Sequence, residues 1–148
     1  MHETFMRRAM EQARQAKDIG EVPVGAVIVY DGEIIAEAHN ERETLGDPTA
    51  HAEVLAIRRA AKKLGRRRLS GCTLYVTLEP CPMCAGTIVM SELDNVYYGA
   101  ADAQAGCAGS VYSLPEDPAF GKRIPCSGGL MRGGCEEIIQ SFFEERRV

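Results

Sequence analysis

Apolar residues recur at steps of three and four positions along two stretches of the chain, which predicts amphipathic helices. The first helix ends at Gly20, and the second runs from Pro48 or Thr49 to Leu64 with Gly65 behind it as a stop signal. The apolar face of the first helix comprises Phe5, Met6, Ala9, Met10, Ala13 and Ala16.

Apolar runs that are bounded by turn signals predict four strands. The first run leads into Asp31-Gly32, a pair that favours a two-residue hairpin turn because both positions tolerate a positive φ. The predicted strands cover residues 24–30, 33–39, 72–78 and 95–99.

The segments between these elements are less regular. Residues 40–49 are polar and predict a loop, whereas residues 82–90 have the composition of a helix. Glycine and proline interrupt the pattern over residues 100–134, so we expect a long loop that could hold one more short strand or helix. A final helix is expected to bury four residues: Ile138, Ile139, Phe142 and Phe143.

Strands that alternate with helices favour one α/β domain over residues 1–148, in which helices cover a sheet. The hairpin makes this sheet mixed, since its two strands run antiparallel. The hydrophobic fraction of 45% suits a single packed core.

Composition also limits the partners and the location of the protein. No apolar run approaches the roughly 20 residues of a membrane helix, and the N-terminus lacks the order of a secretory signal, so we expect a cytoplasmic protein with no membrane partner. The net charge of −4 argues against a generally basic nucleic-acid-binding domain. The arginines at residues 66–68 could form a local basic patch or a solvated connection.

Two short clusters carry candidate metal chemistry. His51 lies at one predicted helix start, and Cys81 and Cys84 lie at another. Zinc takes nitrogen and sulfur ligands, and the Cys-x-x-Cys spacing lets both sulfurs reach one ion. Three protein ligands leave an open position for water, which is the arrangement of a catalytic rather than a structural zinc site. The sequence therefore predicts one catalytic zinc ion per chain.

Glu53, two residues after the histidine, is the predicted general acid and base. Zinc lowers the pKa of a bound water from about 16 to about 7. A carboxylate beside that water can take its proton and return it to a substrate.

Other interpretations of these clusters are a thioredoxin-like redox pair and a zinc module without catalysis. A glutamate in a first helical turn can also simply compensate the helix dipole. Redox chemistry has no use for the His-x-Glu cluster, and dipole compensation does not explain why the two clusters occur together, whereas the zinc module without catalysis stays an alternative. Cys107, Cys126 and Cys135 match no zinc spacing and are expected to be thiols, and Cys72 is expected in the core.

The combination of His51-Ala52-Glu53 with Pro80-Cys81-Pro82-Met83-Cys84 resembles the zinc-dependent cytidine deaminase superfamily. Further segments resemble the bacterial tRNA-specific adenosine deaminases within it. These are residues 21–26, 38–40, 47–53, 75–81 and 85–86.

This resemblance implies a three-layer α-β-α fold with a mixed five-stranded sheet, a homodimer, and conversion of the wobble adenosine of a tRNA anticodon to inosine. It implies that His51, Cys81 and Cys84 hold Zn²⁺ while Glu53 moves protons. Asn40 sits where the family hydrogen-bonds the target base, although an asparagine there could also form a turn. Asp102 fits the family pattern as a second substrate-binding residue.

A deaminase of a free nucleobase or nucleoside, such as guanine or cytosine, is the alternative function. The acidic net charge suits a small substrate. Ala101 and Gln104 stand where the RNA-editing relatives commonly carry a basic residue, and the chain lacks their lysine-rich tail. Phe120-Gly121-Lys122 replaces a Phe-Asn-His triplet of these relatives.

Overall fold

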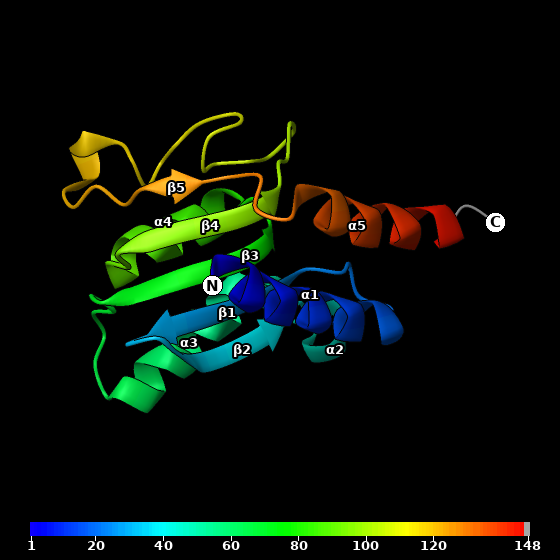
Figure 1. Ribbon diagram of the computed structural model, residues 1–148, viewed down its shortest axis with the longest axis horizontal. Helices are drawn as coiled ribbons and strands as arrows, with labels where there is room; N and C mark the ends of the chain where they lie inside the picture. Colours follow the sequence, from blue (N-terminus) through cyan, green and yellow to red (C-terminus); the bar gives the residue numbers. More distant parts are fainter. Residues whose placement is uncertain (147–148) are drawn as a thin grey trace.

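The computed structural model describes residues 1–146 and shows a five-stranded mixed sheet between two layers of helices (Figure 1). Across the sheet the strands lie in the order β2-β1-β3-β4-β5. β1 pairs antiparallel with β2 and β3, whereas β4 pairs parallel with β3 and β5. The predicted three-layer fold is therefore confirmed. The strands are β1 (Gly25–Tyr30), β2 (Glu33–His39), β3 (Cys72–Leu78), β4 (Asn95–Ala100) and β5 (Cys126–Ser127).

Helices cover both faces of the sheet because its central strands are apolar on both sides. Ala26 and Ile28 of β1 pack in the core under α3 and α4, whereas Val27 and Val29 pack in the core under α1 and α5. This alternation follows from the two-residue period of a strand. The helices are α1 (His2–Asp18), α2 (Arg42–Leu45), α3 (Ala52–Leu64), α4 (Pro82–Ser91) and α5 (Arg132–Arg146).

The N-terminal helix and the hairpin agree with the predictions. Asp31 and Gly32 form the tight turn with φ of 53° and 77°, so both residues have the positive φ that the pair was expected to tolerate. The predicted apolar stripe of α1 faces the sheet, and its buried members are Met6, Ala9, Met10, Ala13 and Ala16.

The predicted start of α3 at Pro48 or Thr49 is wrong, because the helix begins at Ala52. The Asp47 carboxylate accepts hydrogen bonds from the Thr49 amide and hydroxyl, both at 2.8 Å. These bonds fold the segment into a local turn that competes with helix. His51 is consequently left at the N-cap in an extended conformation.

Two further segments differ from expectation. The polar loop over residues 40–49 contains α2, a four-residue helix too short for a periodic pattern. In α5, Ile138 and Phe142 are buried as expected, but Phe143 is 48% exposed and Ile139 is only half-buried. Residues 138 and 142 lie one helical turn apart and face the sheet, and their C-terminal neighbours lie on the flank of the helix.

The long segment after β4 holds the two-residue strand β5 and a single 3-10 turn over Pro118–Phe120. Cys72 is fully buried in the core, as predicted. Over the described residues 1–146, none of the helices combines the length and apolar character that a membrane crossing requires.

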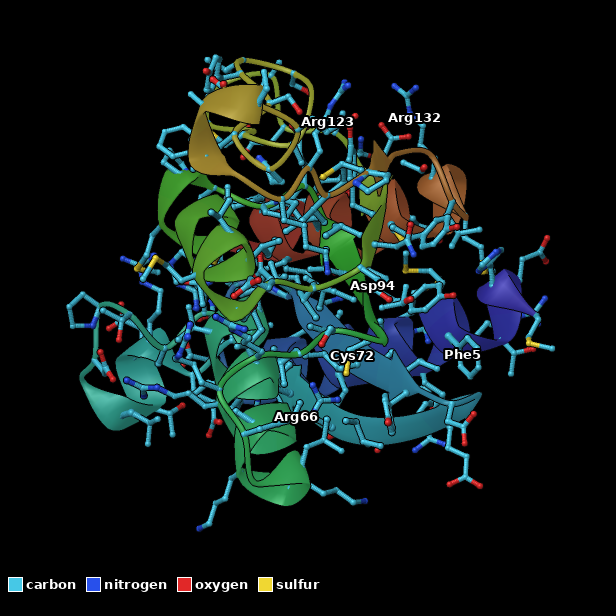
Figure 2. The ribbon with its side chains drawn as sticks, turned by 90° about the vertical axis from the view of Figure 1, so that its left-hand side faces the viewer. Phe5, Arg66, Cys72, Asp94, Arg123 and Arg132 are labelled. Carbon is cyan, nitrogen blue, oxygen red and sulfur yellow. The ribbon has the colours of Figure 1, made fainter. Side chains whose placement is uncertain are left out.

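The arginines at residues 66–68 follow the C-terminal end of α3, and Arg66 is labelled in Figure 2. Arg66 donates hydrogen bonds to the backbone oxygens of Arg68 and Ser70, and Arg68 pairs with Glu92 at 3.1 Å. A helix of the length of α3 places this cluster roughly 20 Å from His51. These contacts favour a structural connection over a nucleic-acid-binding patch.

Candidate active site

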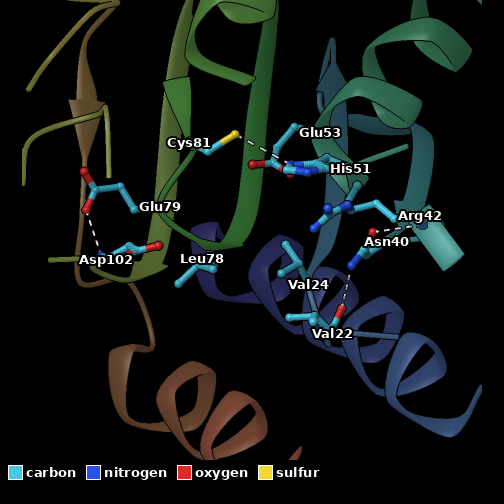
Figure 3. Close-up of a pocket in the computed structure, with 11 residues that line it drawn as sticks. Val22, Val24, Asn40, Arg42, His51, Glu53, Leu78, Glu79, Cys81 and Asp102 are labelled. Carbon is cyan, nitrogen blue, oxygen red and sulfur yellow. Dashed lines mark hydrogen bonds between the residues drawn. The ribbon is translucent and has the colours of Figure 1, made fainter. Parts of the chain in front are cut away.

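Two helix starts bring together the residues predicted to bind a metal. His51 is the N-cap of α3, Cys81 is the N-cap of α4, and Cys84 lies in the first turn of α4. His51 Nδ1 lies 3.6 Å from Cys81 Sγ and 3.4 Å from Cys84 Sγ, and Figure 3 shows the contact between His51 and Cys81. The structure thus assembles the predicted ligand set from two segments about thirty residues apart.

The separations within this cluster fit a tetrahedral zinc ion. Bond lengths of about 2.3 Å to sulfur and about 2.0 Å to nitrogen give a nitrogen-to-sulfur separation of about 3.5 Å at the tetrahedral angle. The observed separations of 3.4 and 3.6 Å lie on either side of that value. One imidazole nitrogen and two sulfurs also form a donor set that zinc prefers. The residues present therefore fit the metal that the sequence predicts.

The protonation states of the cluster are coupled. A hydrogen bond from the Cys84 thiol, opposed by burial and assisted by His51, lowers the pKa of Cys81 to about 4. The same hydrogen bond and burial raise the pKa of Cys84. Cys81 is thus a thiolate at neutral pH, and the Cys84 proton must leave when a cation binds both sulfurs.

Glu53 lies in the first turn of α3, directly beside the cluster. It is 4% exposed, and burial raises the pKa of its carboxyl group to about 7. A carboxyl group with a pKa near neutrality can both accept and donate a proton under physiological conditions. Its position matches the prediction made from the His-x-Glu spacing.

A cavity of about 170 Å³ opens beside these residues. Its size is below the roughly 300 Å³ of pockets for drug-sized ligands, so it suits a single small ring system. Valine and leucine side chains form its apolar walls, and polar groups lie around them (Figure 3). The lining residues are Val22, Val24, Asn40, Arg42, His51, Ala52, Glu53, Leu78, Glu79, Cys81 and Asp102.

Asn40 lines this cavity and is 6% exposed. Its Nδ2 donates to the Val22 carbonyl oxygen at 3.2 Å, and its Oδ1 accepts from the Arg42 amide at 3.2 Å. The second bond forms the turn that was the alternative interpretation of this asparagine. The placement is compatible with both roles, and substrate binding by Asn40 stays a prediction.

Asp102 lies on the opposite wall of the cavity (Figure 3). Its Oδ1 accepts hydrogen bonds from the amides of Gln104 and Ala105 at 3.0 and 3.2 Å. Its own amide donates to Glu79 Oε1 at 3.0 Å. These hydrogen bonds hold the backbone around Asp102, whose role towards substrate also stays a prediction.

Arg42 and Glu79 also line the cavity, although no sequence pattern indicates a role for either residue. Arg42 follows Asn40 by two residues and could have been noticed for that proximity. Glu79 lies inside the motif that ends at Cys81, but a glutamate between a strand and a helix carries no distinctive pattern.

Two buried glutamates hold the loops that form the walls of the cavity. Glu21, 1% exposed, accepts hydrogen bonds from the Thr44 amide and hydroxyl, both at 2.7 Å, and from the Glu43 amide. Burial alone would raise the pKa of Glu21, but these hydrogen bonds hold it below its ordinary value. Glu79 holds the loop of Asp102 in the same way. Burial would raise the pKa of Glu79, but its hydrogen bonds outweigh burial and lower that pKa.

A wider groove of about 560 Å³ adjoins the cavity and shares Val22, Asn40 and Arg42 with it. The exposed Phe143 and the Arg146 side chain form its outer part. An aromatic ring and two guanidinium groups thus lie along a path that leads out of the cavity.

Comparison with known proteins identifies the family of this chain. The family model of the MafB19-like deaminases matches residues 1–147. The tRNA-specific adenosine deaminase of Bacillus subtilis is 47% identical over 145 residues, which cover 98% of this chain and 90% of that protein. The enzyme of the same name from Aquifex aeolicus is 43% identical and covers 98% of this chain and 95% of its own length.

Solved structures give the same result. A structure from a study of A-to-I editing by tRNA:A34 deaminases at the wobble position of transfer RNA superposes with a TM-score of 0.88. It is 42% identical and covers 91% of this chain and 98% of its own. The guanine deaminase of Bacillus subtilis is 49% identical but covers 74% of this chain and 71% of its own, with a TM-score of 0.67. Given these matches over nearly the whole length, the chain belongs to the MafB19-like deaminases and, within them, to the family of the tRNA-specific adenosine deaminases.

Proposed function

We propose that this protein hydrolytically deaminates the wobble adenosine of a tRNA anticodon to inosine. The observation that carries the proposal is the buried Glu53 beside His51, Cys81 and Cys84 in a cavity suited to one base, within a chain whose relatives bear this activity in their names. We expect one Zn²⁺ per chain on the three ligands, which when bound supplies Lewis acidity and lowers the pKa of a water at its open position.

Glu53 moves the protons of the reaction. It accepts a proton from the attacking water and delivers it to N1 of adenine as the water oxygen adds to C6. A second transfer through the same carboxyl group carries the remaining proton of the added oxygen to the amino group on C6. The C6–N bond then breaks, ammonia leaves, and the C6 carbonyl of inosine forms.

The remaining cavity residues orient the base. Val24 and Leu78 offer apolar surface to a planar ring, and Asn40 and Asp102 offer polar groups at opposite sides of the cavity. A base in an anticodon loop is single-stranded, so it can leave its stack and enter such a cavity at low cost.

The groove that adjoins the cavity suits the nucleotides next to the target base. Arg42 and Arg146 can neutralise phosphates, and Phe143 can stack on a base. Glu21 and Glu43 line the same groove, so the two arginines provide local positive groups without making the groove basic as a whole. We expect the protein to meet its tRNA in the cytoplasm.

We also expect a homodimer. α4 is apolar on nearly every side, and only part of it is covered by the sheet. Met90 at its C-terminal end is 70% exposed. A second copy that packs against this helix would remove that apolar surface from water.

Guanine deamination is the second candidate, because the guanine deaminase noted above is 49% identical over its aligned part. The cavity is large enough for a purine in either case. The difference between the candidates lies in whether the substrate is a free base or a base within RNA.

The test is to incubate the zinc-loaded protein with an anticodon stem-loop that carries adenosine at the wobble position, and to measure inosine by mass spectrometry. A stem-loop with that adenosine moved by one nucleotide is the control for position, and free guanine and cytosine are the competing substrates. We expect inosine only from the first RNA. Turnover of free guanine or cytosine with no inosine in the RNA would overturn the proposal.

A further inference from the structure

Glu79 has no assigned role, yet it is 2% exposed and lies at the junction between β3 and α4, two residues before Cys81. A carboxylate in such a position costs free energy unless hydrogen bonds replace the water it has lost. Its contacts therefore indicate what the residue does.

Both oxygens of this carboxylate accept hydrogen bonds from one loop. Oε1 accepts from the Asp102 amide at 3.0 Å and from the Ser110 hydroxyl. Oε2 accepts from the Ala108 amide at 3.0 Å and the Ser110 amide at 2.9 Å. Glu79 thus satisfies three backbone amides of a segment that has no helix or strand to satisfy them.

The loop is fitted closely around this side chain. A Cβ atom added to Gly106 would overlap the Glu79 carboxylate, so only glycine fits there. The backbone makes two further links, because the Glu79 amide donates to Ala100 and the Cys107 amide donates to Pro80, both at 2.8 Å. The loop is therefore held directly on the segment that ends in Cys81.

We propose that Glu79 is a positioning residue that fixes the loop of residues 102–110 to the metal-binding segment and thereby holds Asp102 on the wall of the cavity. Figure 3 shows the bond between Glu79 and Asp102 beside the cavity. The proposal rests on the proposed function to the extent that Asp102 contacts the substrate. Glu79 itself acts through Asp102 and takes no part in proton transfer.

Replacement of Glu79 by glutamine tests this role with almost no change in volume. An amide can accept at only one of the two positions, so either orientation leaves a backbone amide facing an N–H donor. We expect zinc content to stay at one ion per chain, kcat to change little, and KM for the stem-loop to rise about tenfold, as for the loss of a positioning contact.

A double-mutant cycle separates positioning from general stability. If Glu79 acts through Asp102, Asp102→Ala should raise KM about tenfold in the native chain but less than about twofold in the Glu79→Gln background. If the KM increases of the two single variants multiply in the double variant, the proposal is overturned. Loss of zinc from a folded Glu79→Gln chain would also overturn it. Glu136→Gln, in an exposed pair with Arg132, is the control and should leave KM unchanged.

Should Glu79→Gln fail to fold, Ser110→Ala replaces it in the same cycle, since it removes one hydroxyl donor and leaves the carboxylate in place. Ser110→Ala should raise KM by a smaller factor, again without adding to the effect of Asp102→Ala. If the native chain deaminates only free guanine, the proposed function fails, but the cycle can be run on guanine with the same criterion. The two proposals therefore fail separately.

Discussion

The metal-binding centre and the walls of the cavity are held in place by different means. His51 and Cys81 are helix N-caps, and both helices pack against the sheet through buried apolar side chains. Asn40 and Asp102 lie on irregular segments, and the contacts that hold these segments include a buried glutamate in each case: Glu21 binds the neighbouring α2, and Glu79 binds the loop of Asp102. The predicted metal ligands and proton-transfer group thus lie at the starts of helices, whereas the predicted substrate-binding residues Asn40 and Asp102 lie on loops.

This difference has a consequence for mutations. Substitution of a metal ligand should abolish deamination, because all three ligands are needed to hold the ion. Damage to a glutamate that holds a loop should weaken substrate binding or stability by a limited factor, because the sheet and the centre remain intact.

The largest effect is expected from loss of a metal ligand. Cys84→Ser should reduce zinc from about one ion per chain to well below it, and should lower deamination by more than about 100-fold, since changes to groups that merely support ligands already cost 10- to 100-fold. Metal analysis of purified protein gives the first value and inosine formation gives the second. Cys126→Ala is the matched control, because this half-buried thiol lies outside the cluster. A fully zinc-loaded and active Cys84→Ser chain would show that the centre is wrongly assigned.

Loss of the proton-transfer group should come next. Glu53→Gln keeps the size of the side chain and leaves all three ligands in place. We expect normal zinc content with deamination lowered about 10²- to 10⁴-fold, the usual contribution of a general acid and base. Single-turnover measurement of inosine checks this, with zinc content measured on the same sample. Turnover within a few-fold of the native rate would refute the role of Glu53.

The smallest effect is expected from substitution of Glu21, which binds the α2 segment on the side of the cavity that carries Asn40. Because hydrogen bonds lower the pKa of Glu21 in the folded protein, its ionised form stabilises the fold above its ordinary value of 4.5, and this stability is lost as the pH falls below 4.5. Glu21→Gln should cost about 1 to 3 kcal/mol at neutral pH, where buried donors lose an acceptor.

Denaturant unfolding at a series of pH values measures this effect. The Glu21→Gln variant should show a shallower loss of stability below pH 4.5 than the native chain. Glu3→Gln, in an exposed pair with Arg7, should leave the pH profile unchanged. Identical profiles for the native and Glu21→Gln chains would mean that Glu21 does not hold the α2 segment as described.

The candidate metal cluster could be predicted from the sequence because its residues form pairs that are close together along the chain. Cys81 and Cys84 share one helical turn, and His51 and Glu53 are two residues apart, so each pair identifies itself locally. The strands and the hairpin could be predicted for the same reason, since their apolar runs and the Asp31-Gly32 turn are local patterns. The predicted start of α3 was wrong because the hydrogen bonds from Thr49 to the Asp47 carboxylate favour a local turn over helix.

The loops around the cavity could not be predicted in this way. Glu21 and Thr44, like Glu79 and Asp102, are 23 residues apart, and only the packed sheet brings each pair together. A glutamate that satisfies distant backbone amides has the same sequence signature as a solvated one, because burial and hydrogen bonding are properties of the fold. The sequence alone therefore predicted the cluster of His51, Cys81 and Cys84, with Glu53 beside it, that the fold brings together. The tertiary structure decided which residues hold the cavity open, since that depends on contacts between segments with no local pattern in common.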